Sequence, residues 1–272
     1  MKRLYFILAF CLLSTAGAFA QIIDKITGLD RPTYMAANGT DLYFAQENSD
    51  YIWKADLSQT NPTPTQVVQL GVSGTATGLT VDGNYLYYCE NATLGLRRID
   101  LTVANPTAEM VFATGVDSIT ELLIDGNMVY FSTTSNIEAV DLTDSTYTRT
   151  VIVPNTGGGS YGFSKLNTLL FYSTNGSTEI KQLNLGSNAV NSAITGLNSA
   201  KGTIWIGSTF YFTEGTDGKI MTLPASASVP ATLADADTLV TVGSELVDMI
   251  HIGDNVYASV INENKIMVVL NT

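Results

Sequence analysis

The feature that most constrains the fold is a six-residue motif that recurs six times along the chain. Each copy has a turn residue, an apolar residue three positions later, and then one or two aromatic residues, except that the last copy ends in Ala. The copies span residues 39–44, 83–88, 126–131, 167–172, 207–212 and 253–258. The anchoring aromatics (Tyr43, Tyr87, Tyr130, Phe171, Tyr211 and Tyr257) are 44, 43, 41, 40 and 46 residues apart. A period of about 40–46 residues is typical of the four-stranded blades of β-propellers.

A second pattern recurs in register with the first. Short strands with alternating apolar residues follow the motif at 52–57, 96–101, 137–142 and 180–185, with weaker copies at 220–223 and 266–269. An irregular β-sandwich is the alternative, but it gives no reason for six registered copies. We therefore predict a six-bladed β-propeller with four antiparallel strands per blade.

Each blade has the same predicted order. The innermost strands precede the turn, at 33–37, 76–81, 119–124, 161–166, 202–206 and 247–252. Strands with apolar residues at both odd and even positions, such as Leu122, Leu123 and Ile124, indicate a sheet packed on both faces. Because the last repeat ends at residues 269–270, we expect residues 22–26 to supply the fourth, outermost strand of the last blade and so close the ring.

The N-terminus predicts export. Lys2 and Arg3 precede an apolar run, and the small residues around Ala20 form a cleavage site before Gln21, as in a secretory signal peptide. The predicted organisation is a signal peptide at 1–20 and a single propeller domain at 21–272, secreted or periplasmic. One cysteine, Cys89, then remains, and its place on an aromatic strand favours a buried, inert thiol.

Composition limits the partners. The formal net charge is −12 and no cluster of Lys and Arg occurs, which argues against nucleic acid and anionic membrane. The apolar run is too short to span a bilayer, so we predict no membrane span. A monomer is also expected. The chain has one histidine, His251, so a His-rich metal site cannot be built. A Ser-His-Asp triad is not expected either, because His251 lies toward the turn end, away from the usual position of propeller ligands. Counted from the turn, His251 is a core or channel residue near the turn end.

The motif Gly-x-x-Leu-Tyr-Phe, followed by Ile-x-x-x-Asp-Leu, resembles the six-bladed propeller superfamily of NHL-repeat proteins, YWTD domains, TolB-like propellers and gluconolactonase-like lactonases. Residues 213–220 are similar to the passage between the second and third strands of NHL repeats. The YWTD tetrapeptide is absent, so a receptor-type YWTD domain is not expected. Quinone-dependent sugar dehydrogenases of similar fold rely on a His base, which also argues against that activity.

Function is expected where the copies differ. Counting back from the turn residue aligns Tyr34, Gly78, Glu121, Gly162, Gly202 and Asp248 near the start of the innermost strands. Counting forward aligns Gln46, Glu90, Thr133, Thr174 and Glu214 at the end of the second strands. Both positions lie near the channel mouth on the face of the inter-blade loops. The candidate ligand-binding residues are therefore Tyr34, Arg31, Glu90, Glu121, Glu214 and Asp248.

Two functions are carried forward. The first is a non-enzymatic module that binds or scaffolds a protein or a small polar ligand at the channel mouth, with Ca²⁺ or another divalent cation as candidate cofactor. Cell-surface adhesion or assembly with an envelope complex is a variant of it. The second is a metal-dependent lactonase-like hydrolase, since the lactonase subset holds its metal with acidic and amide side chains at this mouth. The resemblance implies Glu90, Glu121, Asn175 and Asp248 as metal candidates.

Overall fold

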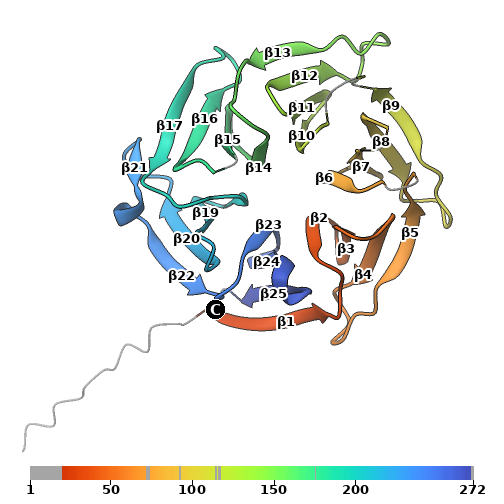
Figure 1. Cartoon of the computed structure of the whole chain (residues 1–272), viewed down its shortest axis with the longest axis horizontal. Helices are drawn as coiled ribbons and strands as arrows, with labels where there is room; N and C mark the ends of the chain where they lie inside the picture. The colour runs from red at the N-terminus through yellow and green to blue at the C-terminus, as the bar shows by residue number, and fades with distance from the viewer. Residues whose placement is uncertain are drawn as a thin grey trace, which may run out of the picture.

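The computed structural model describes residues 20–71, 74–91, 93–113, 115, 118–174 and 176–270. In this part of the chain six antiparallel sheets stand around a central axis like the blades of a propeller (Figure 1). Each blade runs from an innermost strand at the axis to an outer strand at the rim. The prediction of an all-β, six-bladed propeller is confirmed.

Blades 1 to 3 follow one another directly in the sequence. Blade 1 contains β2 (Pro32–Asn38), β3 (Asp41–Gln46), β4 (Tyr51–Asp56) and β5 (Thr65–Gln69). Blade 2 contains β6 (Ala76–Asp82), β7 (Tyr85–Glu90), β8 (Gly95–Asp100) and β9 (Glu109–Ala113). Blade 3 contains β10 (Glu121–Asp125), β11 (Met128–Ser132), β12 (Ile137–Asp141) and β13 (Thr150–Val153).

The remaining blades depart from strict sequence order. Blade 4 contains β14 (Ser160–Leu166), β15 (Leu169–Thr174), β16 (Glu179–Asn184), β17 (Val190–Thr195) and the short β21 (Ala231–Thr232). Blade 5 contains β18 (Thr203–Ile206), β19 (Thr209–Glu214), β20 (Lys219–Pro224) and β22 (Asp237–Thr241). Blade 6 contains β23 (Leu246–Ile252), β24 (Asn255–Val260), β25 (Lys265–Leu270) and β1 (Gln21–Thr27).

The first and last parts of the described chain share blade 6. Strand β1 pairs antiparallel with β25, with Gln21 opposite Leu270 and Thr27 opposite Lys265. β1 is thus the outer strand of this blade, next to the C-terminal strand, as Figure 1 shows. This pairing joins the two ends of the domain through backbone hydrogen bonds.

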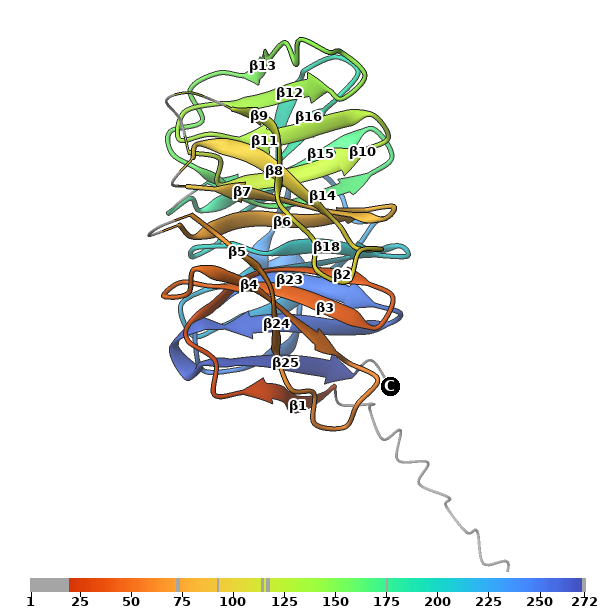
Figure 2. The same cartoon turned by 90° about the vertical axis from the view of Figure 1, so that its right-hand side faces the viewer.

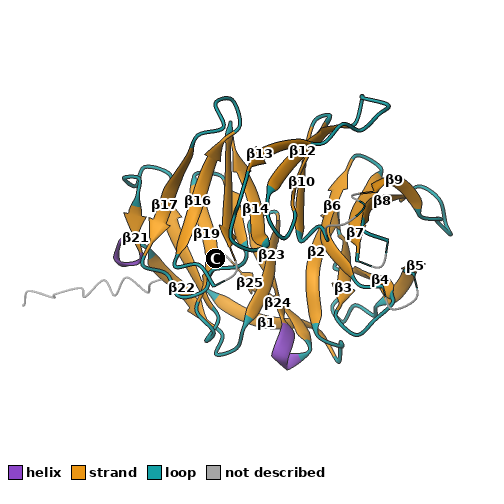
Figure 3. Cartoon of the chain, turned by 45° about the horizontal axis from the view of Figure 1, so that its top comes forward, coloured by secondary structure: helices purple, strands orange, loops and turns teal. Residues whose placement is uncertain are grey.

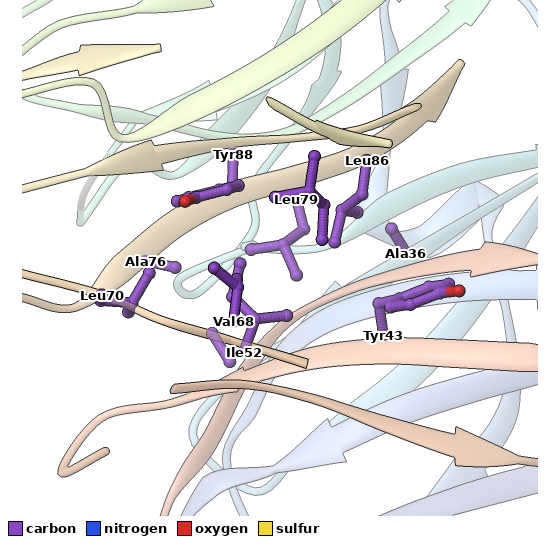
Figure 4. Close-up of a cluster of buried hydrophobic side chains, with 11 residues drawn as sticks. Ala36, Tyr43, Ile52, Val68, Leu70, Ala76, Leu79, Leu86 and Tyr88 are labelled. Atoms are coloured by element: carbon purple, nitrogen blue, oxygen red, sulfur yellow. The ribbon is translucent and has the colours of Figure 1, made fainter. Parts of the chain in front are cut away.

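The core is divided among the junctions between blades. Six clusters of buried apolar side chains are found in the described residues, and each one joins two neighbouring blades. The cluster between blades 1 and 2 packs Tyr43 and Ile52 of one blade toward Leu86 and Tyr88 of the next (Figure 4). Five of the six anchoring aromatics are buried core residues, because each sheet buries both faces against its neighbours, whereas Tyr130 is partly exposed.

The molecule is a disc of stacked sheets when seen from the side (Figure 2). In the described residues helix is limited to two single turns, η1 (Leu233–Asp235) and η2 (Ile261–Glu263), coloured purple in Figure 3. None of the helices described could cross a bilayer, since each is too short.

One element was not predicted. After β20 the chain leaves blade 5, and β21 pairs in parallel with β17 at the outer edge of blade 4 before β22 completes blade 5. A two-residue strand has no periodicity that a sequence pattern could show.

The role of β1 in ring stability can be tested with two isoleucines of that strand. Ile26 is 3% exposed and packs against blade 1, whereas Ile22 is 37% exposed. We expect Ile26→Ala to lower the free energy of unfolding by about 2–4 kcal/mol, and Ile22→Ala to change it by no more than about 0.5 kcal/mol. Chemical denaturation would measure both. Equal effects of the two substitutions would show that β1 does not contribute a buried face to the ring.

Candidate site in the central channel

The six positions aligned near the start of the innermost strands form contacts between adjacent blades. Three of them are glycines, and a Cβ at each would crowd the next blade. A Cβ at Gly78 would lie 3.0 Å from the backbone nitrogen of Leu122, one at Gly202 would lie 3.1 Å from that of Met249, and one at Gly162 would overlap the carbonyl oxygen of Lys201. Backbones therefore meet without intervening side chains at these three junctions.

Two of the other positions carry carboxylates that bridge to the next blade. Glu121 on β10 accepts the N–H of Gly162 on β14 at 3.0 Å through Oε2, and that of Leu122 at 3.1 Å through Oε1. Asp248 on β23 accepts the N–H of Met35 on β2 at 2.7 Å through Oδ2, and that of Met249 at 2.7 Å through Oδ1. Each carboxylate thus satisfies backbone donors on both sides of a blade junction.

These carboxylates line a cavity of about 410 Å³ along the axis of the ring. Glu121 and Asp248 lie toward one end of it, and Lys165 and His251, just before their turns, lie toward the other. Trp205 also lines this cavity. The volume is in the range of sites for small ligands.

The two carboxyl groups are electrostatically linked. Burial, together with the charge of Asp248, raises the pKa of Glu121 to about 8 against the hydrogen bonds from Leu122 and Gly162. Burial raises the pKa of Asp248 to about 7 against those from Met35 and Met249. Asp248 keeps part of its surface open to the channel although protein surrounds it. Removal from bulk water is the dominant cause in both, so near neutral pH the pair tends to retain a proton.

Tyr34 belongs to the same group. Burial raises the pKa of its phenol, and the nearby charges of Glu121, Tyr161 and Asp248 raise it further. Burial and Glu121 also raise the pKa of the Cys89 thiol. Cys89 is 1% exposed, so the prediction that it is buried is confirmed. Tyr34, Glu121 and Asp248, which are far apart in the sequence, therefore act on one another at the axis.

Glu90 and Glu214 have a different environment. Glu90 Oε1 accepts the N–H of Gly71 and Oε2 forms an ion pair with Arg97 at 2.5 Å. Glu214 Oε1 accepts the N–H of Asn198 at 2.7 Å. At the same position in blade 1, Gln46 Oε1 accepts the N–H of Asp30 at 2.5 Å. The shared role of these side chains is to accept an N–H of the loop that precedes their own blade.

That role had a signal in the sequence. Gln and Glu share an acceptor oxygen but not a charge, and this aligned position holds Gln in blade 1 and Glu in blades 2 and 5, which favours a common hydrogen bond over a common ligand. Arg31 likewise joins blades, through hydrogen bonds from its side chain to Glu47 and Asn262. Asn175 lies outside the described residues.

Sequence reasoning missed two channel residues. Lys165 and Trp205 lie two positions before their turn residues, as His251 does, and all three line the cavity. Counting back from the turn residue, which placed His251 near the turn end of the channel, would have placed Lys165 and Trp205 there too. Lys165 forms an ion pair with Asp125 of blade 3 at 2.8 Å.

Three of the four predicted metal ligands lie in the part of the chain that the structure describes. Within the described residues no group of three or more His, Cys, Asp or Glu side chains is arranged to hold a metal ion. Glu121 and Asp248 share the channel, but Glu90 is engaged with its own loop and Arg97. Glu90, Glu121 and Asp248, the described members of the predicted set that also included Asn175, therefore do not form such a group. The physical reason is that Glu121 and Asp248 stand at the start of innermost strands, whereas Glu90 stands at the end of a second strand, where its side chain bonds the loop before its own blade.

Comparison with solved structures places the fold among six-bladed propellers of several functions. A proposed gluconolactonase has a TM-score of 0.71 at 12% identity, with 93% of this chain and 92% of that chain covered. The PQQ-bound aldose sugar dehydrogenase of Streptomyces coelicolor has a TM-score of 0.65 at 14% identity, with coverage of 93% and 98%. A chain of a nidogen/laminin complex has a TM-score of 0.65 at 14% identity, with coverage of 80% and 83%.

These similarities establish the class of protein, a six-bladed β-propeller, as the sequence predicted. No family model and no curated protein matches the sequence. Identities of 12–14% show the fold alone, so the activities of these neighbours do not transfer to this chain.

The close approach at Gly162 makes a specific prediction. Gly162→Ala adds a Cβ where the backbone of blade 5 leaves no space, at a φ of +61°. Gly126→Ala, at a φ of +59° with open space around it, is the matched control for the left-handed backbone. We expect the control to cost about 1–2 kcal/mol and Gly162→Ala about 1–3 kcal/mol more, both measured by denaturant unfolding. Similar costs would contradict tight contact between blades 4 and 5.

The buried pair also predicts how stability depends on pH. A carboxyl whose pKa is raised by folding binds more protons in the folded state, so stability falls as pH rises through the interval between the two values. For Glu121 this interval runs from 4.5 to about 8. We expect the free energy of unfolding of the wild type to fall across it, and to fall less in Glu121→Gln. Urea unfolding at several pH values would measure this, with Glu109→Gln, an exposed carboxylate on β9, as control. A slope unchanged by Glu121→Gln would contradict the electrostatic role.

Proposed function

We propose that this protein is an exported, non-enzymatic binding module whose central channel takes a small, positively charged ligand between Glu121 and Asp248. The observation that carries the proposal is that Glu121 and Asp248 share one cavity, in which burial raises the pKa of both carboxyl groups and the charge of Asp248 raises that of Glu121 further. Strongly perturbed carboxyl groups in a cavity are a common mark of a functional site. Export rests on the signal-peptide pattern of residues 1–20, of which the structure describes Ala20 alone.

A cation would relieve the main electrostatic cost of the site. With the pair ionised, two negative charges lie in a buried environment without an opposing cation among the partners described for them. An ammonium or guanidinium group has hydrogen-bond donors for the remaining lone pairs of the two carboxylates. The net charge of −12 favours the approach of such a ligand at low ionic strength.

The hydrolase alternative lacks a supporting observation. A metal-dependent mechanism needs several oxygen ligands around one point, and no such group of acidic, His or Cys side chains occurs among the described residues. A protein partner at the rim is compatible with the neighbour that was solved in the nidogen/laminin complex. In this protein, however, the perturbed groups lie inside the channel, which favours a small ligand.

The charge of the ligand can be tested with a matched pair of probes. At a pH above about 8, where Glu121 is ionised, we expect n-butylammonium to bind saturably and to raise the melting temperature, because ligands of the folded state stabilise it. Uncharged n-butanol should have no such effect. Isothermal titration calorimetry and thermal unfolding would measure binding. Glu121→Gln and Asp248→Asn should each weaken binding roughly tenfold or more.

Asp254→Asn is the matched control, because Asp254 is an exposed carboxylate in the turn at the other end of blade 6. An equal loss of binding in this variant would attribute the effect to net charge alone. Binding of calcium in place of the ammonium probe would replace the organic cation by a metal ion. Absence of binding by every cation would overturn the proposal.

A further inference from the structure

A second cavity lies away from the axis, where the chain passes from the closing strand into blade 1. Its volume is about 480 Å³. The walls come from the loop between β1 and β2, the loop between β3 and β4, and Trp53 of strand β4. Nothing in the proposed function uses these residues, so this cavity is a separate candidate for binding.

An oriented aromatic ring forms one wall. The indole N–H of Trp53 donates to Ser49 Oγ at 2.9 Å, which fixes the orientation of the ring. Trp53 is on the third strand of its blade, packs against the core cluster between blades 6 and 1, and remains partly exposed. It therefore presents a rigid apolar surface to the cavity.

Short polar side chains surround this ring. Asn48 Nδ2 donates to Asp30 Oδ1 at 2.9 Å, which holds the carboxylate and the amide side by side. Gln46 uses Oε1 to accept the N–H of Asp30. Among the described residues, Asp30 Oδ2, Asn48 Oδ1 and Gln46 Nε2 have no side-chain or backbone partner, so two acceptors and one donor remain for a ligand.

The chemistry of the walls selects a class of ligand. Among the nine described residues that line the cavity none is Lys, Arg or His, and Asp30 supplies a negative charge, which disfavours phosphates and carboxylates. A purely apolar ligand would leave the polar groups unpaired, at a cost. A sugar ring has an apolar C–H face for the indole and adjacent hydroxyl groups that both donate and accept. Together these features match a neutral pyranose.

We propose that the cavity bounded by Trp53, Asp30, Asn48 and Gln46 is a binding site for a neutral pyranose sugar. The ring packs on the indole, and neighbouring hydroxyl groups bond to the carboxylate of Asp30 and the amide of Asn48. Thr27, Gly28 and Asp30, which line the cavity, are exposed, so the sugar can be a terminal unit of a larger glycan. The proposal does not depend on the ligand of the central channel.

The chain offers a direct optical test. It has two tryptophans, Trp53 and Trp205, so Trp205→Phe leaves Trp53 as the one indole that reports on the cavity. The probes are the methyl glycosides of glucose, mannose and galactose, each titrated at millimolar concentrations while indole fluorescence is recorded. Calorimetry on the wild-type chain with the same glycosides checks that Trp205→Phe has not altered the site. We expect saturable binding of at least one of them by both methods.

Two substitutions then assign the contacts. Asn48→Ala and Asp30→Ala should each weaken glycoside binding roughly tenfold, as loss of a hydrogen bond to a sugar hydroxyl requires. Asn105→Ala is the matched control, because Asn105 is an exposed amide in a different surface cavity, between blades 1 and 2. Circular dichroism would confirm that each variant is folded.

Three results would contradict a sugar site in this cavity. No saturable response to any of the three glycosides, or equal weakening in Asn105→Ala, would overturn the proposal. Binding of choline without binding of glycosides would also overturn it, since a carboxylate beside an indole can hold a quaternary ammonium.

Discussion

The close packing of the six innermost strands around one axis is the constraint on which the rest of the structure depends. At Gly78, Gly162 and Gly202 the backbone of one blade meets the next without an intervening side chain. At Glu121 and Asp248 a carboxylate joins the backbones instead. These contacts fix the spacing of the blades, and the apolar clusters between blades fill the space farther from the axis.

The same contacts create the functional potential of the channel. A neutral side chain at Glu121 or Asp248 could also join two blades, but a carboxylate does so at the cost of burying a charge. Hydrogen bonds from backbone N–H groups reduce this cost without removing it, since the pKa of both groups stays raised. The pair is therefore a structural link and, in the proposed function, also the place where a cationic ligand binds.

The second cavity arises from closure of the ring. Strand β1 belongs to blade 6, while the loop that follows it leads into blade 1, so Asp30 comes to lie beside Asn48 and Trp53. Residues from two blades meet there because the chain must cross that junction. A circular arrangement of repeats thus produces one junction that differs from the others, and recognition of a ligand can be specific to it.

The amino-acid sequence by itself determined the number of blades, the order of their strands and the strand positions to within a few residues. This was so because turn glycines, aromatic anchors and apolar alternation are local signals that repeat with a fixed period. The repeat also placed Tyr34, Glu121 and Asp248 at one equivalent position near the start of the innermost strands. What only the tertiary structure decided is which aligned residues meet: Glu121 and Asp248 face one channel, while Glu90 and Glu214 turn to the loops. The repeat gives each residue a position on a strand, but which backbone groups of other blades and loops lie within reach of its side chain depends on how the ring packs.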